Sequence, residues 1–271
     1  MSKIVFIGGG NMASCLIGGM LANGFSNQDI IVSEPNEASR QRIASTHGVI
    51  TTEDNISAVS QADIVVLAVK PQVMAAVAEP LAAGLDHGPI VVSIAAGIPV
   101  NALQNWLGQE LKIVRAMPNT PAMVQSGATG LFASQSLSED QHSVIENIFS
   151  AVGYACWVSQ ESDIDAVTAV SGSGPAYFFL VYEAMLKVAQ ELGLDSQTSS
   201  QLTLHTAMGA ARLALSSDSA PDELRKQVTS PGGTTQAAIE SFQAHDLEGI
   251  FRAAMASALE RAKEMSDDFA S

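Results

Sequence analysis

Five short runs of β-branched and apolar residues in the first half of the chain constrain its fold more than any other feature. The runs lie at residues 4–7, 30–32, 64–69, 90–94 and 113–114. They are apolar along their whole length, as expected for parallel strands that are covered on both faces. Stretches with helical spacing separate them. This alternation predicts βαβ units and a doubly wound, mostly parallel α/β sheet of the Rossmann type.

The pattern changes after Asp163, where the β-branched runs stop. Helices are predicted at about residues 164–192, 196–216, 221–229, 235–243 and 246–268. Residues that end helices separate them, namely Gly193, residues 216–218, residues 230–233 and His245. The sequence therefore predicts a sheet domain over residues 1–162 and an all-helical domain over residues 163–271.

Charge restricts the possible partners. The formal net charge is −15, whereas nucleic acids and anionic membranes require a basic surface. Neither is therefore expected as a partner. An anionic ligand would have to be held locally, and backbone amides at helix N-termini can do this without a positive surface.

The cysteines and the N-terminus carry no sign of a metal site, a disulfide framework or export. Cys15 and Cys156 lack metal-ligand spacing and stand among apolar residues, which predicts small buried side chains and no metal. No signal peptide precedes the first strand. No unbroken apolar run reaches the ~20 residues of a membrane span. A cytoplasmic location is expected by default.

The predicted helix around residues 176–189 is apolar on nearly all sides. Tyr177, Phe178, Phe179, Leu180 and Val181 follow one another directly, so the helix has no polar face in this region. Such a helix must be buried all round. A domain of about a hundred residues can hardly achieve this alone. A subunit interface is therefore predicted; the alternative is a central helix within one monomer.

A glycine-rich turn follows the first strand directly. Residues 8–13 read Gly-Gly-Gly-Asn-Met-Ala, the Gly-x-Gly-x-x-Ala form of the dinucleotide-binding fingerprint. The first glycine permits a tight turn, the second lets the backbone approach a pyrophosphate, and the small third residue lets helix and strand pack closely. Because the pattern stands between a predicted strand and a predicted helix, we expect a dinucleotide site here.

The end of the second strand leaves the choice of dinucleotide open. Glu34 could accept hydrogen bonds from the ribose hydroxyls of NAD. Ser33, Asn36 and Arg40 could instead hold the phosphate of NADP.

Two further turns should border the same ligand, since ligands of open parallel sheets lie beyond the carboxyl ends of the strands. Residues 68–71, Ala-Val-Lys-Pro, follow one strand, and Ala95 and Gly97 follow the next. Pro71 fixes the exit of the chain. Lys70 either contacts the cofactor or is simply solvated.

In these motifs and in three others, the chain resembles the pyrroline-5-carboxylate reductase family, along nearly its whole length. The three others are Arg-Ala-Met-Pro-Asn-Thr-Pro at residues 115–121, Ser-Gly-Ser-Gly-Pro-Ala-Tyr at 171–177 and Ser-Pro-Gly-Gly-Thr-Thr at 230–235. Their combination and order are specific to that family.

The resemblance implies a dinucleotide-binding Rossmann domain followed by a helical dimerisation and substrate-binding domain whose helices interleave between subunits. The homodimers of the family often assemble further, commonly as five dimers in a homodecamer. The implied reaction is the reduction of L-1-pyrroline-5-carboxylate to L-proline, the last step of proline biosynthesis. The hydride donor is usually NADPH and in some members also NADH.

The resemblance also implies which residues form the site. Cofactor contacts carry over to Gly8, Gly10, Asn11, Met12, Ser33, Asn55, Ala68, Val69, Lys70, Pro71 and Ala95. Substrate contacts carry over to Gly232, Gly233, Thr234, Thr235 and Asp218. The chain departs from the family at Glu34, which disfavours a phosphate, and at Asp218, where many members have glutamate.

The turn at residues 231–235 suits a carboxylated imine. Its glycines leave the backbone uncovered, and its amides can converge on a carboxylate at the start of a helix. Thr235 is the predicted catalytic residue, with its hydroxyl hydrogen-bonded to the ring nitrogen. An ordinary helix N-cap is the alternative. None of the five histidines falls in a motif, which fits an imine that binds already protonated and needs hydride and orientation more than a strong acid.

Two other functions compete. A β-hydroxyacid dehydrogenase shares the two-domain plan but would place a catalytic lysine early in the second domain. Lys187 stands well past Ser171, and its helix contains no asparagine. A nicotinamide-sensing module without catalysis would have no need of the Gly-Gly-Thr-Thr turn.

Overall fold

A single eight-stranded sheet forms the centre of the N-terminal part of the chain. The structure is a computed structural model that describes residues 2–108 and 110–270. The strands are β1 (Ile4–Ile7), β2 (Ile30–Ser33), β3 (Ile50–Thr52), β4 (Ile64–Leu67), β5 (Ile90–Ser93), β6 (Ile113–Met117), β7 (Gly127–Ala133) and β8 (Gly153–Trp157). They lie in the order β3-β2-β1-β4-β5-β6-β7-β8. Every pair is parallel except β6–β7. The predicted doubly wound, mostly parallel sheet is confirmed.

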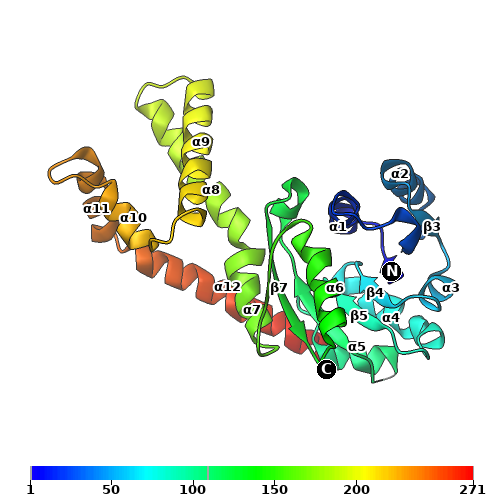
Figure 1. The fold of residues 1–271 in the computed structure, drawn as a ribbon. Helices are drawn as coiled ribbons and strands as arrows, with labels where there is room; N and C mark the ends of the chain where they lie inside the picture. The colour runs from blue at the N-terminus through cyan, green and yellow to red at the C-terminus, as the bar shows by residue number, and fades with distance from the viewer. Residues whose placement is uncertain (1, 109, 271) are drawn as a thin grey trace. The chain divides into compact units, whose positions relative to one another are not determined.

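Helices cover both faces of this sheet, as the ribbon in Figure 1 shows. The helices and short turns of this part are α1 (Asn11–Ala22), η1 (Asn27–Asp29), α2 (Glu37–His47), α3 (Asn55–Val59), η2 (Pro71–Val73), α4 (Met74–Leu81), η3 (Ala82–Gly84), α5 (Val100–Leu107), η4 (Thr120–Val124), α6 (Glu139–Ser150), α7 (Asp163–Val167) and the π-helical turn η5 (Thr168–Gly172).

Two cores explain why the strands are apolar on both sides. Ile4 and Phe6 pack into a cluster with α1, α2 and α6. Val5 and Ile7 point the other way, into a cluster with α3, α4 and α5. Because successive side chains of a strand point to opposite faces, only an unbroken apolar run can fill both layers.

Three strands are absent from the sequence prediction, namely β3, β7 and β8. β3 and β8 are the outermost strands of the sheet. β7 pairs antiparallel with β6, and its sequence, Gly-Ala-Thr-Gly-Leu-Phe-Ala, contains two glycines. Edge strands and glycine-containing strands need no long β-branched run, so the apolar pattern does not reveal them.

The C-terminal part of the chain is entirely helical among the described residues. Its helices are α8 (Gly174–Glu191), α9 (Ser196–Leu215), α10 (Pro221–Gln227), α11 (Thr234–Ala244) and α12 (Leu247–Ala270). Contacts divide the chain into two compact units. One, here called the sheet unit, comprises residues up to Pro175 together with α12 from Ser257 onward. The other, the helical unit, comprises Ala176–Ala256. The domain boundary at residue 162 remains a prediction.

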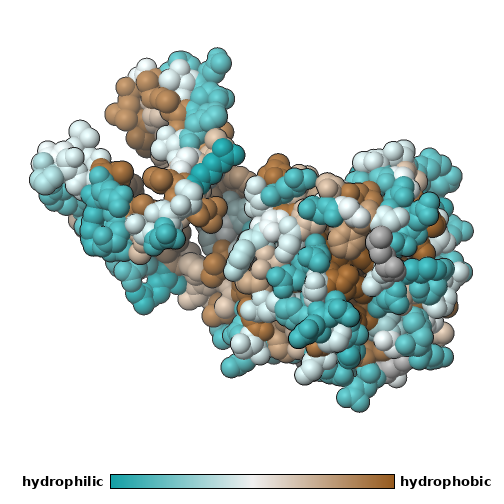
Figure 2. Space-filling model, viewed as in Figure 1, coloured by the Kyte–Doolittle hydropathy of each residue, from teal (hydrophilic) through white to brown (hydrophobic). Residues whose placement is uncertain are grey.

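Large apolar side chains of α8 lie on the surface. Phe178, Phe179 and Leu180 are 62%, 58% and 67% exposed. Brown, hydrophobic atoms gather over the α8–α9 hairpin in Figure 2. The alternative of a central helix within one monomer is therefore wrong, because the chain alone leaves these side chains uncovered.

By length and composition, one segment of the described residues, Asp163–Glu191, could cross a membrane; 22% of its most apolar window is buried. The segment is not one unbroken apolar run, so it does not contradict the expectation that no such run reaches the ~20 residues of a membrane span. Its most apolar window holds no more than two charged residues, and serines and glycines interrupt the apolar run.

Candidate active site

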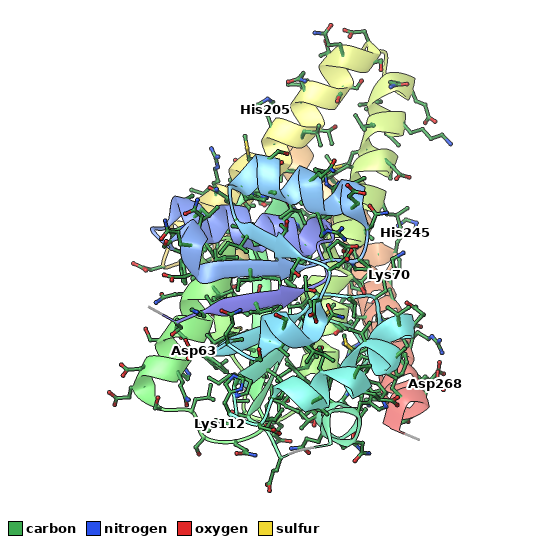
Figure 3. All side chains as sticks on the ribbon, turned by 90° about the vertical axis from the view of Figure 1, so that its right-hand side faces the viewer. Asp63, Lys70, Lys112, His205, His245 and Asp268 are labelled. Carbon is green, nitrogen blue, oxygen red and sulfur yellow. The ribbon has the colours of Figure 1, made fainter. Side chains whose placement is uncertain are left out.

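A pocket of about 450 Å³ lies where β1, β2 and β4 end. Its lining residues are Ile7, Gly8, Gly9, Gly10, Ser33, Glu34, Pro35, Asn55, Ala68, Val69, Lys70, Val73 and Val77. Figure 3 labels Asp63, which precedes β4, and Lys70, which follows it and is one of the residues that line the pocket. The strand order reverses here, since β1 has β2 on one side and β4 on the other. In open α/β sheets this is the position at which ligands bind.

Two glycines of the turn serve different purposes. Gly8 has φ +99°, and a Cβ there would lie 2.9 Å from both the Ala68 carbonyl oxygen and Val69 Cγ1. Gly8 is therefore required by the fold itself. A Cβ on Gly10 would meet nothing within 4 Å. Packing does not require a glycine at position 10, whereas a ligand lying against the backbone would.

The start of α1 offers backbone amides to an anion. Gly10 is the N-cap residue, and neither a side-chain cap nor an acidic residue in the first turn satisfies these N–H groups. The amides and the helix dipole together favour a phosphate group. This resolves the difficulty of binding an anionic dinucleotide to a chain with a net charge of −15. The residues present fit a nicotinamide dinucleotide.

Polar groups at the ends of β2 and β3 are held in a fixed arrangement. Ser33 is fully buried, and its hydroxyl donates to Asn55 Oδ1 at 2.6 Å. Asn55 begins α3, whose N-cap is Asp54. Ser33 and Asn55 are far apart in sequence, and the tertiary fold brings them to one wall of the pocket.

The Glu34 carboxylate lies against the glycine turn. Its Oε2 accepts from the Gly9 N–H at 2.8 Å and its Oε1 from the Asn36 N–H at 3.0 Å. Arg40 donates to the carbonyl oxygens of Glu34 and Pro35, both at 2.7 Å, and forms an ion pair with Glu53 at 3.1 Å.

Most, but not all, of the expected cofactor residues line this pocket. Those that do are Gly8, Gly10, Ser33, Asn55, Ala68, Val69 and Lys70. Those outside its lining are Asn11, Met12, Pro71 and Ala95. Asn11 and Met12 begin α1, Pro71 begins η2, and Ala95 follows β5 and is 8% exposed.

Sequence reasoning did not find several other lining residues. Val73 and Val77 belong to the turn and helix that follow Lys70, and Pro35 follows Glu34. The valines carry no signal, because an apolar residue facing a ligand has the same pattern as one facing the core. Gly9 was recognised only as part of the fingerprint; a Cβ there would collide with the side chain of Ile43.

The Gly-Gly-Thr-Thr turn lies in the helical unit, at the start of α11. Gly233 is the N-cap residue and receives no side-chain cap. The Gly232 N–H donates to Gln236 Oε1 at 2.7 Å, and the Gly233 N–H donates to the Ser230 carbonyl at 3.0 Å. Of the amides expected to meet a carboxylate, those of Gly232 and Gly233 are therefore already engaged. The first-turn amides of Thr234 and Thr235 are the groups that point out of the helix end.

Thr235 is not the N-cap of α11. It lies at the second helical position and is half-buried. Within the part of the chain that the structure describes, its hydroxyl makes no hydrogen bond. The alternative of an ordinary N-cap is wrong, because Gly233 occupies that position. Asp218, the other expected substrate contact, is exposed in the loop between α9 and α10.

Two of the family motifs form a polar joint inside the sheet unit. Asn119 Oδ1 accepts from the Ala128 N–H at 2.8 Å, and Asn119 Nδ2 donates to the Ser171 carbonyl at 3.1 Å. The Ser171 hydroxyl donates to the Ala128 carbonyl at 3.0 Å. Because Ser171 belongs to the π-helical turn, this joint fixes the turn to β7. π-Helical turns occur frequently at functional sites.

A buried charge cluster lies elsewhere in the sheet unit. Arg115 is 4% exposed, is 2.9 Å from Glu161 Oε1 and 3.9 Å from Asp165 Oδ1. Burial raises the pKa of Asp165, and the Arg115 charge opposes that rise. Sequence reasoning did not assign this cluster. The signal was an arginine in an apolar strand, which must find carboxylates when buried.

No group of three or more potential metal ligands is found among the described residues.

Comparison with known proteins gives two family matches within the chain. Residues 161–265 match the family model "Pyrroline-5-carboxylate reductase dimerisation". Residues 3–97 match "NADP oxidoreductase coenzyme F420-dependent". The first match contains the exposed apolar helix α8, and it indicates a homo-oligomer.

Whole-length relatives are also found. The pyrroline-5-carboxylate reductase of Pseudomonas aeruginosa is 50% identical over 98% of this chain and 97% of its own length. That of Vibrio alginolyticus is 44% identical over 98% of both chains.

Solved structures agree. A pyrroline-5-carboxylate reductase from Coxiella burnetii has a TM-score of 0.94 and 44% identity, over 98% of both chains. A Plasmodium falciparum pyrroline carboxylate reductase with NADP bound has a TM-score of 0.85 and 28% identity, also over 98% of both chains. These full-length relatives show that the chain, with its pocket at the ends of β1, β2 and β4 and its Gly-Gly-Thr-Thr turn, belongs to the pyrroline-5-carboxylate reductase family of NAD(P)H-dependent oxidoreductases.

Proposed function

We propose that this protein reduces L-1-pyrroline-5-carboxylate to L-proline with NAD(P)H, the last step of proline biosynthesis. The observation that carries the proposal is that the chain joins a dinucleotide pocket to a glycine turn at an uncapped helix start. Full-length relatives at 50% and 44% identity have this activity in their names.

The cofactor would be held by groups of the sheet unit. The uncapped amides of α1 suit the pyrophosphate, and the open space beside Gly10 lets it approach the backbone. Ser33 and Asn55 lie at the ends of the strands where the ribose is expected. When bound, NAD(P)H supplies the hydride.

The substrate would be held by the start of α11. Its carboxylate suits the first-turn amides of Thr234 and Thr235, which lie at the positive end of the helix dipole. The Thr235 hydroxyl, which has no hydrogen-bond partner among the described residues, is free to accept from the protonated ring nitrogen. We assign Thr235 as the catalytic residue on this basis.

This arrangement needs no strong general acid. An imine that binds already protonated carries the proton that the product amine retains. Hydride adds to the carbon of the C=N bond, and the electron pair of that bond becomes the nitrogen lone pair. The task of the protein is therefore orientation and exclusion of water. A keto-acid reductase would also need a proton donor, and Lys187, the candidate for the rival dehydrogenase, lies exposed on α8.

Assembly and location are also proposed. The homo-oligomer would be a dimer with α8 in its interface, and five dimers could close into a ring. Hydride chemistry with NAD(P)H fits the cytoplasm. The net charge of −15 supports our view that neither nucleic acid nor an anionic membrane is a partner.

Initial-rate kinetics with L-1-pyrroline-5-carboxylate test the activity. We expect NAD(P)H oxidation that depends on this substrate, with L-proline as the product by chromatography. Binding of the dinucleotide without turnover would contradict the proposal and favour a nicotinamide-sensing module.

A further inference from the structure

The feature that carries a further inference is the carboxylate of Glu34 at the adenosine-ribose end of the pocket. In a Rossmann domain the end of the second strand faces the ribose hydroxyls of NAD or the 2′-phosphate of NADP. Glu34 follows β2 directly and lines the pocket. Its side chain is fixed, because both of its oxygens accept backbone N–H groups.

These two hydrogen bonds hold the negatively charged Glu34 carboxylate at this position. The N–H groups of Gly9 and Asn36, at 2.8 and 3.0 Å, are donors that an incoming phosphate could otherwise use. With Glu34 in place, a 2′-phosphate would meet a like charge and occupied donors. The ribose hydroxyls of NADH, by contrast, are donors, and each carboxylate oxygen keeps lone pairs that can accept from them.

The nearby polar groups do not compensate. Arg40, the cation closest along the chain, is bound to two backbone carbonyls and to Glu53. The Ser33 hydroxyl donates to Asn55. Lys70 also lines the pocket, but it follows β4, and β1 separates β4 from β2 in the sheet. Lys70 therefore lies on the other side of the glycine turn.

We propose that Glu34 makes this protein select NADH over NADPH by occupying the position that the 2′-phosphate would take. The proposal rests on the proposed function in one respect, which is that both concern the same cofactor site. It contrasts with the Plasmodium falciparum relative, whose structure holds NADP. The nicotinamide end of the two cofactors is identical, so selection acts on binding and not on the hydride transfer.

Direct binding measurements test the proposal without the reaction. The dissociation constants of NADH and NADPH are measured by calorimetry on the full-length protein, and thermal shifts with each cofactor give a second readout. We expect the unmodified protein to bind NADH at least about tenfold more tightly than NADPH, which corresponds to ~1.4 kcal/mol.

Two substitutions and a control complete the test. Glu34→Gln removes the charge and keeps the shape, and Glu34→Ser also clears the space; each should reduce the NADH preference several-fold, Glu34→Ser by more. Glu79→Gln removes an equal charge from the exposed surface of α4, outside the pocket lining, and should leave the ratio unchanged. Equal or tighter binding of NADPH by the unmodified protein would overturn the proposal. So would an unchanged ratio in folded Glu34→Gln protein.

The outcome is separable from that of the proposed function. If NADH binds with the expected preference but pyrroline-5-carboxylate is not reduced, Glu34 keeps its role and the proposed reaction fails. If the substrate is reduced equally well with both cofactors and both bind equally, the reaction stands and the selection by Glu34 fails.

Discussion

The sheet unit and the helical unit treat their large apolar side chains in opposite ways. In the sheet unit, Phe6, Leu16 and Phe149 are completely buried between the sheet and its helices. In the helical unit, Phe178 and Phe179 are more than half exposed. The two units have similarly apolar sequences, so hydrophobicity alone does not decide which side chains a chain can bury by itself.

Geometry explains the difference. A sheet has two broad faces, and helices from the same chain close both of them. Long helices with apolar residues on every side offer more surface than one short unit can cover. The sheet unit therefore has a complete core, whereas the helical unit needs a partner surface. The matched dimerisation region identifies that partner as a second copy of the chain.

The largest effect is expected from a charge on the exposed apolar helix. Phe179→Asp would bury an unpaired carboxylate in the dimer, at a cost of roughly 3–5 kcal/mol. Because an obligate interface resembles a core, we expect loss of folded protein and not a clean monomer. Sedimentation and circular dichroism measure this. Gln61→Glu, on the exposed surface of the sheet unit, is the control and should assemble normally. A stable, active monomer of Phe179→Asp would remove α8 from the interface.

Substitutions at two positions of the glycine turn allow its role in folding and its role in dinucleotide binding to be measured separately. Gly8→Ala should destabilise the protein by about 1–3 kcal/mol, because its φ is +99° and the new Cβ would press on the Ala68 carbonyl. Gly10→Ala should melt normally, since its Cβ meets nothing, but should weaken dinucleotide binding about tenfold or more. Melting curves and calorimetry on both variants give the comparison. Normal dinucleotide affinity in Gly10→Ala would show that the open space is not the cofactor site.

A substitution at Thr235 likewise separates an effect on catalysis from an effect on folding, here in the helical unit. Thr235→Ala should lower kcat/KM with pyrroline-5-carboxylate by an amount equivalent to ~1–3 kcal/mol, one hydrogen bond to a charged group. Because Gly233 is the N-cap, the melting temperature should stay nearly unchanged, and dinucleotide affinity should too. Thr235→Ser restores the hydroxyl and should recover most of the activity. Full catalytic efficiency in Thr235→Ala would end the catalytic assignment.

The smallest effect concerns the buried charges of the sheet unit. Burial raises the pKa of Asp165 above its usual 3.8, although Arg115 and Lys263 oppose the rise and Glu161 adds to it. A carboxyl whose pKa is higher in the folded state stabilises the fold below its unfolded pKa and loses that contribution as pH rises through the folded value. We therefore compare the free energy of unfolding of Asp165→Asn with that of the unmodified protein. The variant should gain in this comparison as the pH rises from 4 to 7, because only the unmodified protein loses stability over that range. Urea denaturation at both values measures it; a difference of the opposite sign would show that Arg115 dominates.

Much of the architecture was predictable because it depends on local periodicity. The five β-branched runs predicted the central strands, and the helical spacing predicted α9 and α12 closely. β7 and β8 were not predictable, because β7 contains two glycines and β8 lies at the edge of the sheet. Their pairing with the rest of the sheet is set by contacts between distant segments.

The candidate site also contains some residues that the sequence identifies and others that it does not. The fingerprint marked Gly8 and Gly10 because a backbone conformation and a close approach each require a particular residue type. Val73 and Val77 could not be distinguished from core residues. The sequence also left the role of Glu34 open, since residue type alone does not say where a side chain points.

The sequence by itself determined the strand–helix alternation, the glycine turns at two helix starts and the apolar helix that needs a partner. Each depends on residue type and spacing over a few turns of chain. Only the tertiary structure decided that Glu34 lies on the Gly9 amide, that Arg40 is held by Glu53, and that Gly233 rather than Thr235 caps α11. These are choices among several partners of similar energy, and the choice depends on which distant atoms the packed chain brings within hydrogen-bonding distance.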